Sequence, residues 1–261
     1  MIHIVLAAFL IYIIISLYQL TSIVSDPRSM FRFNNDIGIA VSYTLFYVFM
    51  TYGAFVGVMI GYQAIAKDFY NNAMSTLIVK PVYRDTIING KLISIFAFLL
   101  FLIAVITTFY TATLFILFGD QFASCLNSYL GLLPITIIVP LIYVMIFVSL
   151  SMLVSLIINS RALGLTLSLL LVYISTGIAS SNFAGVISFM FPGNQNYVSD
   201  LIVGWSPFGI LCQVMDQVYL TYTATPIASI MDIQGDVTKL VLFIVVPVIL
   251  GYVVFLRKDI S

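Results

Sequence analysis

Charged residues are scarce in this chain. Lys, Arg, Asp and Glu make up 8% of its 261 residues, whereas a soluble globular domain carries about 25%. The formal net charge is zero, which gives no electrostatic reason to expect nucleic acid as a partner. Residues 92–118 include no charged side chain, and about 20 such residues cross a bilayer. Composition therefore excludes an ordinary soluble domain and predicts an all-α integral membrane protein.

Catalytic and metal-binding motifs are also missing. His3 is the only histidine, and the two cysteines, Cys125 and Cys212, lack metal-ligand spacing and are too few for a disulfide framework. Both cysteines are expected to be free thiols, although the sequence also allows a disulfide between them. The pair Gly90-Lys91 is followed by Leu92 rather than Ser or Thr, so there is no Walker A motif. We therefore expect no enzyme activity in the chain itself, no metal and no cofactor, and any ATP would be bound by another chain.

Long apolar runs predict a single transmembrane domain over residues 1–261 with six membrane-spanning helices. The predicted spans are 2–24, 38–62, 92–118, 129–158, 162–180 and 240–256. The first run has no basic segment before it and exceeds the apolar core of a signal peptide, so a retained helix is expected. No charge falls inside these predicted spans, which argues against an ion-coupled carrier.

Basic residues predict the orientation, because cytoplasmic loops carry an excess of Lys and Arg. With six spans both termini share one side, and that side holds the larger basic set. It consists of Lys67, Lys80, Arg84, Lys91, Arg161, Arg257 and Lys258, against Arg28, Arg32 and Lys239 on the other side. Both termini are therefore predicted to face the cytoplasm, in a plasma membrane.

The region between the fifth and sixth predicted spans is not expected to cross the membrane, because its apolar run 183–191 is too short to span. Its clearest feature is a helix that Ser206 caps and Pro207 begins. Apolar residues recur along it at helical spacing, namely Phe208, Leu211, Cys212, Met215, Val218, Tyr219 and Tyr222. This pattern predicts external re-entrant or interfacial helices before the last span.

Residues 64–91 form the most charged long stretch of the chain, between the second and third predicted spans. An amphipathic helix is predicted over residues 64–78, ended by Pro81 and followed by a polar turn over 83–89. Its apolar stripe is Ala66, Phe69, Tyr70, Ala73, Met74, Leu77 and Ile78, and the opposite face holds Lys67, Asp68, Asn71, Asn72, Ser75 and Thr76. Periodicity alone allows either a helix lying on the membrane surface or a lever moved by a cytoplasmic partner.

The stretch "KDFYNNAMSTLIVKPVYRDTIINGK" resembles the signature of ABC-2 type permeases, the membrane subunits of ATP-binding-cassette exporters. Asp68 stands where that family has Glu, and Asn72-Ala73 stands where it has Gly-Thr. Leu77, Ile78, Pro81, Val82, Arg84, Gly90 and Lys91 match directly. The resemblance implies that this segment couples the membrane subunit to an ATPase chain. The coupling residues it implies are Lys67, Asp68, Asn71, Asn72, Ser75, Lys80, Pro81, Arg84, Gly90 and Lys91.

The resemblance also implies the function: a permease subunit that exports a substrate, as a homodimer or a heterodimer with a similar permease, with ATP hydrolysed by a separate ATPase chain. A secondary carrier or a membrane scaffold is the alternative. The substrate stays open. Gly53, Gly57 and Gly61 place small residues on one helix face, which favours close packing either within the chain or between subunits.

Overall fold

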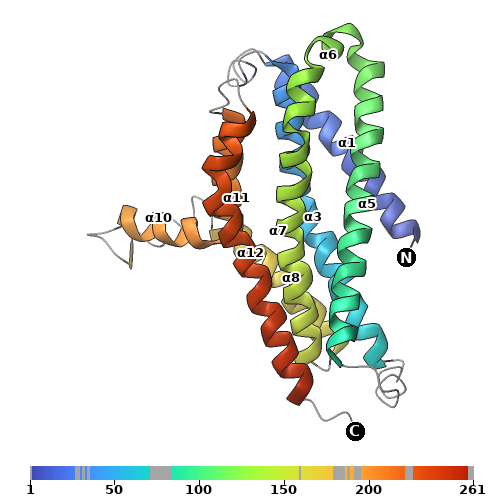
Figure 1. The fold of residues 1–261 in the computed structure, drawn as a ribbon, viewed down its shortest axis with the longest axis vertical. Coiled ribbons are helices and arrows are strands. Elements are labelled where there is room, and N and C mark those ends of the chain that lie inside the picture. Colours follow the sequence, from blue (N-terminus) through green and yellow to red (C-terminus); the bar gives the residue numbers. More distant parts are fainter. Residues whose placement is uncertain are drawn as a thin grey trace. The chain divides into compact units, whose positions relative to one another are not determined.

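The structure is a computed structural model that describes residues 2–26, 30, 33, 36–70, 84–158, 160–178, 186, 189–190, 195–220 and 226–257. Helices make up the elements in this part of the chain (Figure 1). They are α1 (Ile2–Ser25), α3 (Ile37–Tyr70), α5 (Arg84–Phe118), α6 (Asp120–Ser124), α7 (Leu126–Ile157), α8 (Arg161–Ile178), α10 (Gln195–Trp205), α11 (Pro207–Met215), the π-helical turn η1 (Asp216–Leu220) and α12 (Pro226–Arg257).

Among the described residues, five helices are long and apolar enough to cross a membrane, over Ile37–Lys67, Ile88–Phe118, Leu126–Ile157, Arg161–Ile178 and Ile233–Phe255. They correspond to the second through sixth predicted spans. Helix α1 covers the first predicted span with 24 residues, although its stretch with described side chains, Ile11–Ser25, is shorter than a span. The all-helical membrane class is confirmed, and the sixth crossing stays a prediction.

Three helices extend beyond the predicted elements. Helix α12 begins at Pro226, well before the predicted start of the sixth span at residue 240. Helix α5 begins at Arg84, so residues 84–89 of the predicted polar turn over 83–89 are helical. Helix α3 continues without a break to Tyr70, so residues 64–70 end that helix rather than begin a separate one. Residues 62–67 contain neither Gly nor Pro, and nothing in them stops a helix.

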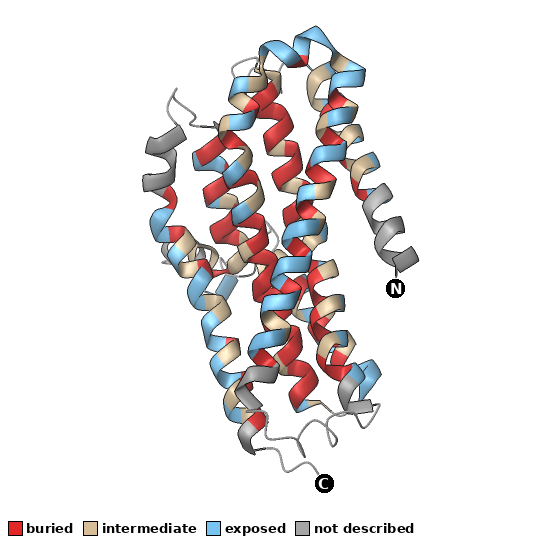
Figure 2. Cartoon of the chain, turned by 45° about the vertical axis from the view of Figure 1, so that its right-hand side comes forward, coloured by how far each residue is buried: buried red, intermediate tan, exposed pale blue. Residues whose placement is uncertain are grey.

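The helices form two compact units. Unit 1 comprises Met1–Gly53, Leu99–Leu141 and Val214–Gly235, and unit 2 comprises Ala54–Phe98, Ile142–Gln213 and Asp236–Ser261. Helices α3, α5 and α7 contribute residues to both units. In Figure 2 the buried positions follow the helix sides that face other helices, and the exposed positions follow the opposite sides.

Tyr219 of η1 lies in the core of unit 1, where it contacts α3 and α7. Its ring makes edge contacts with Phe46 and Tyr43 of α3, at centroid distances of 5.5 and 6.0 Å. Its hydroxyl shares a 2.7 Å hydrogen bond with the hydroxyl of Thr136 on α7, which itself donates to the Leu132 carbonyl. A buried hydroxyl thus keeps a partner where water is scarce. Leu211, Met215, Val218 and Tyr219 of the predicted apolar face are therefore buried against protein, whereas Phe208 and Cys212 are partly exposed and Tyr222 lies outside the described residues.

In unit 2, glycines allow helices to pack closely against one another. A Cβ atom on Gly57 would lie 2.7 Å from a methyl carbon of Val144, and one on Gly61 would lie 2.7 Å from the carbonyl oxygen of Val148. Both glycines therefore let α3 approach α7 within the same chain. Gly164 does the same for α8, because its missing side chain leaves room for the ring of Tyr62.

Candidate functional site

Polar contacts join the ends of three helices in unit 2. The Lys91 ammonium of α5 donates to the backbone carbonyl oxygen of Ala64 on α3. Two residues earlier on α5, the Asn89 side-chain oxygen accepts a hydrogen bond from the Tyr252 hydroxyl of α12. The start of α5 is thereby connected to α3 on one side and to α12 on the other.

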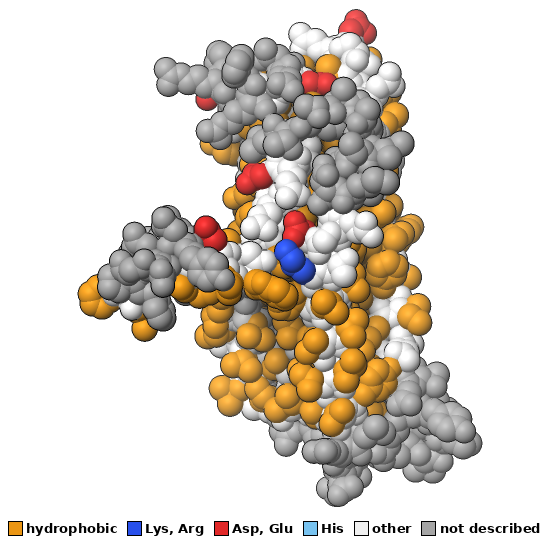
Figure 3. Space-filling model, turned by 60° about the vertical axis from the view of Figure 1, so that its left-hand side comes forward, with side chains coloured by type: hydrophobic (Ala, Val, Ile, Leu, Met, Phe, Trp, Pro, Cys, Tyr) orange, Lys and Arg blue, Asp and Glu red, His pale blue; other side chains and the backbone are white. Residues whose placement is uncertain are grey.

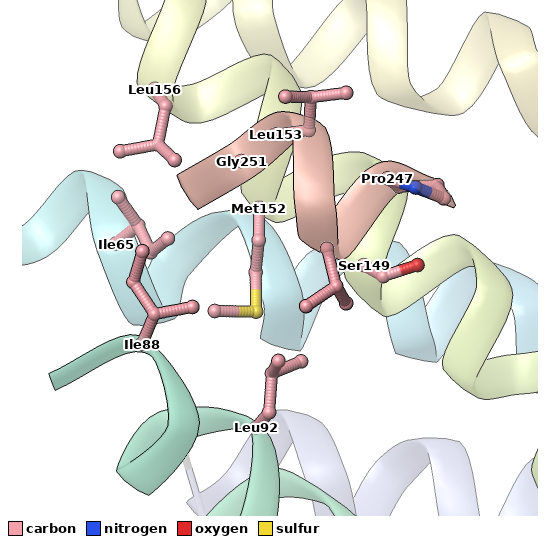
Figure 4. Close-up of a pocket in the computed structure, with 10 residues that line it drawn as sticks. Ile65, Ile88, Leu92, Ser149, Met152, Leu153, Leu156, Pro247 and Gly251 are labelled. Atoms are coloured by element: carbon pink, nitrogen blue, oxygen red, sulfur yellow. The ribbon is translucent and has the colours of Figure 1, made fainter. Parts of the chain in front are cut away.

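An apolar junction lies beside these contacts. It consists of Ile65 from α3, Ile88 and Leu92 from α5, Ser149, Met152, Leu153 and Leu156 from α7, and Pro247, Val248 and Gly251 from α12. Figure 4 shows the Met152 side chain extending into the space between Ile65, Ile88 and Leu92. The cavity left among these side chains is about 10 Å³, no more than one water molecule occupies. The junction is therefore a packed contact and not a substrate cavity.

Helix α7 supplies the rigid side of the junction. Met152 and Leu156 are 3% and 2% exposed, and Ile65 opposite them is 2% exposed. The Ser149 hydroxyl donates to the Ile146 carbonyl of its own helix, so it leaves no buried donor facing the apolar side chains. Close-packed interiors of this kind resist compression and transmit displacement.

The coupling residues implied by the resemblance fall partly on this junction. Lys67 is exposed in the last turn of α3, where its charge complements the helix dipole. Gly90 is exposed on α5 with open space around it, and Lys91 makes the contact to α3. The backbones of Asp68 and Arg84 belong to α3 and α5, but their side chains are not among those described. The remaining residues, Asn71, Asn72, Ser75, Lys80 and Pro81, lie outside the described residues.

Met152 and Tyr252 were not predicted for this site. Each lies in a long apolar run, where sequence periodicity does not tell which neighbour a side chain meets. Of these two residues, only Tyr252 could have been suspected from the sequence, because a tyrosine hydroxyl near a helix end needs a polar partner.

An ion pair lies near the start of a candidate span, in residues that were predicted to belong to the loop before the sixth span. The Lys239 ammonium is 2.7 Å from a carboxylate oxygen of Asp236, within the span Ile233–Phe255. The early start of α12 explains the error, because these charges had been placed in the loop before the helix. Within the described part of the chain, no group of three His, Cys, Asp or Glu side chains is arranged to hold a metal.

Comparison with known proteins places this architecture in a family. The comparison with individual curated proteins finds no match. The family model described as ABC-2 family transporter protein matches residues 2–260, nearly the whole chain. The match extends over both units, over the candidate spans and over the junction at the start of α5. The chain is therefore a membrane protein of the ABC-2 transporter family, as its residue 67–91 motif indicated.

Proposed function

We propose that the chain is the membrane subunit of an ABC exporter, which moves an unidentified substrate with energy from ATP hydrolysed by a separate ATPase chain. Family membership and the apolar helices support this proposal. The subunit would work with a second copy or a similar permease in the plasma membrane, with both termini in the cytoplasm. The charge distribution supports that orientation.

Family membership carries the proposal, and the packed junction in unit 2 supports a route by which movement would pass through the subunit. Residues 71–83 connect α3 to α5, and the ATPase chain would dock on this connection and on the adjoining helix turns. When ATP binding draws the ATPases together, the start of α5 would move. Because Lys91 joins α5 to α3, and because Met152 fills the space between them, the movement would pass to α7 and α12.

Charge reversal tests where the ATPase docks. We expect Asp68→Lys and Arg84→Glu to lower copurification of the ATPase at least tenfold. Reversing either charge would bring like charges together at the contact, which costs several kcal/mol. Asp120→Lys is the matched control, since Asp120 is exposed in α6 on the predicted outer side. Phe69→Ala should lower protein stability and leave copurification intact. Full ATPase recovery with both reversed variants would refute docking on this segment.

Lys91→Gln separates coupling from docking. Lys91 bonds within the chain, so this variant should still copurify with the ATPase while its substrate-stimulated ATP hydrolysis falls. The measurement is ATP hydrolysis with and without transported material in reconstituted vesicles. Unchanged stimulation in Lys91→Gln would show that the α3–α5 contact plays no part in coupling.

The alternative is a carrier driven by an ion gradient, for which the partly buried Asp236–Lys239 pair of α12 is the candidate ionisable group. Transport that continues without any ATPase chain and stops in Asp236→Asn would support the carrier. Transport that requires the ATPase would exclude it.

A further inference from the structure

A groove on the surface of unit 2 adjoins the junction at the start of α5, with which it shares Leu153 and Pro247. Apolar side chains of α12 from Leu242 to Leu250 form one wall, and Leu150 and Leu153 of α7 form the other. Trp205 of α10 and Lys239 of α12 complete the lining. The groove has a volume of about 360 Å³, within the range of sites that hold small ligands.

The charged group at this groove is an ion pair whose cation is the more accessible member. Lys239 is the only charged residue among those that line it. Its partner Asp236 has a side chain only 12% exposed, whereas that of Lys239 is 34% exposed. An ammonium group has three donors, and among the described residues that of Lys239 makes one hydrogen bond, to Asp236. Donors therefore remain for the oxygen atoms of an anion.

The sequence of α12 places Lys239 at the level of lipid headgroups. Lys239 and Arg257 bracket the uncharged residues 240–256, and the two charged residues are about 27 Å apart along the helix. The hydrocarbon core of a bilayer is about 30 Å thick, and Lys, Arg and Trp residues gather at its borders. From Lys239 to Leu250 the groove runs about 16 Å along the helix, close to half of that core. Figure 3 shows hydrophobic side chains gathered beside a basic and an acidic side chain on this face.

We propose that this groove is a binding site for an anionic phospholipid. The lipid phosphate contacts the Lys239 ammonium, and one acyl chain lies along α12 between Leu242 and Leu250. The length of the groove fits one leaflet. A second protein copy seated here would instead remove the Asp236–Lys239 pair from water, which costs free energy that a lipid headgroup does not demand. This site does not depend on the proposed transport function.

Trp205 gives a direct measurement, because it is the only tryptophan of the chain and lines the groove. The full chain would be placed in bilayers that contain phosphatidylglycerol or phosphatidylcholine with brominated acyl chains, since bromine quenches tryptophan fluorescence on contact. We expect half-maximal quenching at about a fivefold lower mole fraction of brominated phosphatidylglycerol, the preference that one lysine provides. Bromines placed near the headgroup should quench more strongly than bromines near the chain end.

Variants connect that preference to the site. Lys239→Gln should abolish the preference for phosphatidylglycerol, and Lys239→Arg should retain it. Leu242→Phe narrows the groove and should weaken quenching by both lipids, whereas Leu170→Phe, at an exposed position on α8, should not. Equal quenching by the two lipids in the unaltered chain would overturn the proposal. Quenching by neither lipid would also overturn it, in favour of a protein partner that covers the groove.

Discussion

At the residue scale, glycines on α3 fix the distance to α7. The backbone carbonyl of Val148 lies 2.7 Å from the position of a Cβ atom on Gly61, and the Ser151 hydroxyl lies closer still. A hydroxyl can rotate away, but a helical carbonyl cannot. We expect Gly61→Ala to lower the free energy of unfolding by about 1–3 kcal/mol, as overpacking does. Thermal unfolding of the purified protein in detergent measures the loss.

Gly177→Ala is the matched control for this experiment. Gly177 also lies in a helix, α8, but nothing lies within 4 Å of a Cβ atom placed there. Its replacement should leave the unfolding temperature unchanged or slightly higher, because alanine favours a helix more than glycine does. Equal losses in the two variants would mean that close packing against Val148 is not the cause.

The residue scale also shows the limit of a sequence motif. The spacing of Gly53, Gly57 and Gly61 predicted a helix face built for close contact, but not the helix that it meets. In the structure, Gly57 and Gly61 approach Val144 and Val148 of the same chain. Any helix with a ridge of suitable shape can pack against such a face. Which helix does so depends on the tertiary structure, and the glycine spacing does not predict it.

At the element scale, the hydroxyl of Ser206 caps the start of α11. The Ser206 side chain accepts a hydrogen bond from the backbone N–H of Gly209 at 3.0 Å and donates to the Val203 carbonyl at 3.0 Å. It therefore joins the end of α10 to the start of α11. We expect Ser206→Ala to cost about 1 kcal/mol of unfolding free energy. Chemical unfolding followed by the fluorescence of the adjacent Trp205 provides the measurement.

Ser124→Ala is the comparison for that cap. The Ser124 hydroxyl is exposed and donates to the Gln121 carbonyl within its own turn. Its removal should change stability by no more than about 0.5 kcal/mol. If both serine variants behave alike, the cap at α11 contributes nothing beyond a surface hydroxyl.

Sequence patterns predicted where the helices lie better than they predicted the residues at which the helices begin and end. The spans over α7 and α8 were predicted to within a few residues, because charged or polar residues flank both apolar runs. The start of α12 was missed because Asp236 and Lys239 resembled a loop, whereas in the helix they neutralise each other at 2.7 Å. The site was predicted only through Gly90, Lys91 and the residues before them. Its partners on α7 and α12 come together through tertiary packing, which leaves no local pattern.

At the scale of the whole molecule, the orientation in the membrane is testable with single cysteines. In a background with Cys125→Ser and Cys212→Ser, we expect Asp120→Cys to react with an impermeant thiol reagent in intact cells. Gly90→Cys should react only after the membrane is opened. Both positions are exposed in the structure, so accessibility to the reagent depends on the side of the membrane. The reverse labelling pattern would contradict the predicted orientation.

The helices of this molecule differ greatly in how much of their surface other protein atoms cover. In its most apolar stretch α7 is 72% buried, whereas the corresponding stretch of α12 is 17% buried. Because lipid tails accept any apolar shape while a close-packed interior does not, the two helices should tolerate sequence change unequally. As the chain diverges over evolutionary time, Leu, Ile, Val and Phe can replace one another along the outer side of α12 away from the groove lining, while α7 keeps side chains of nearly constant size and shape.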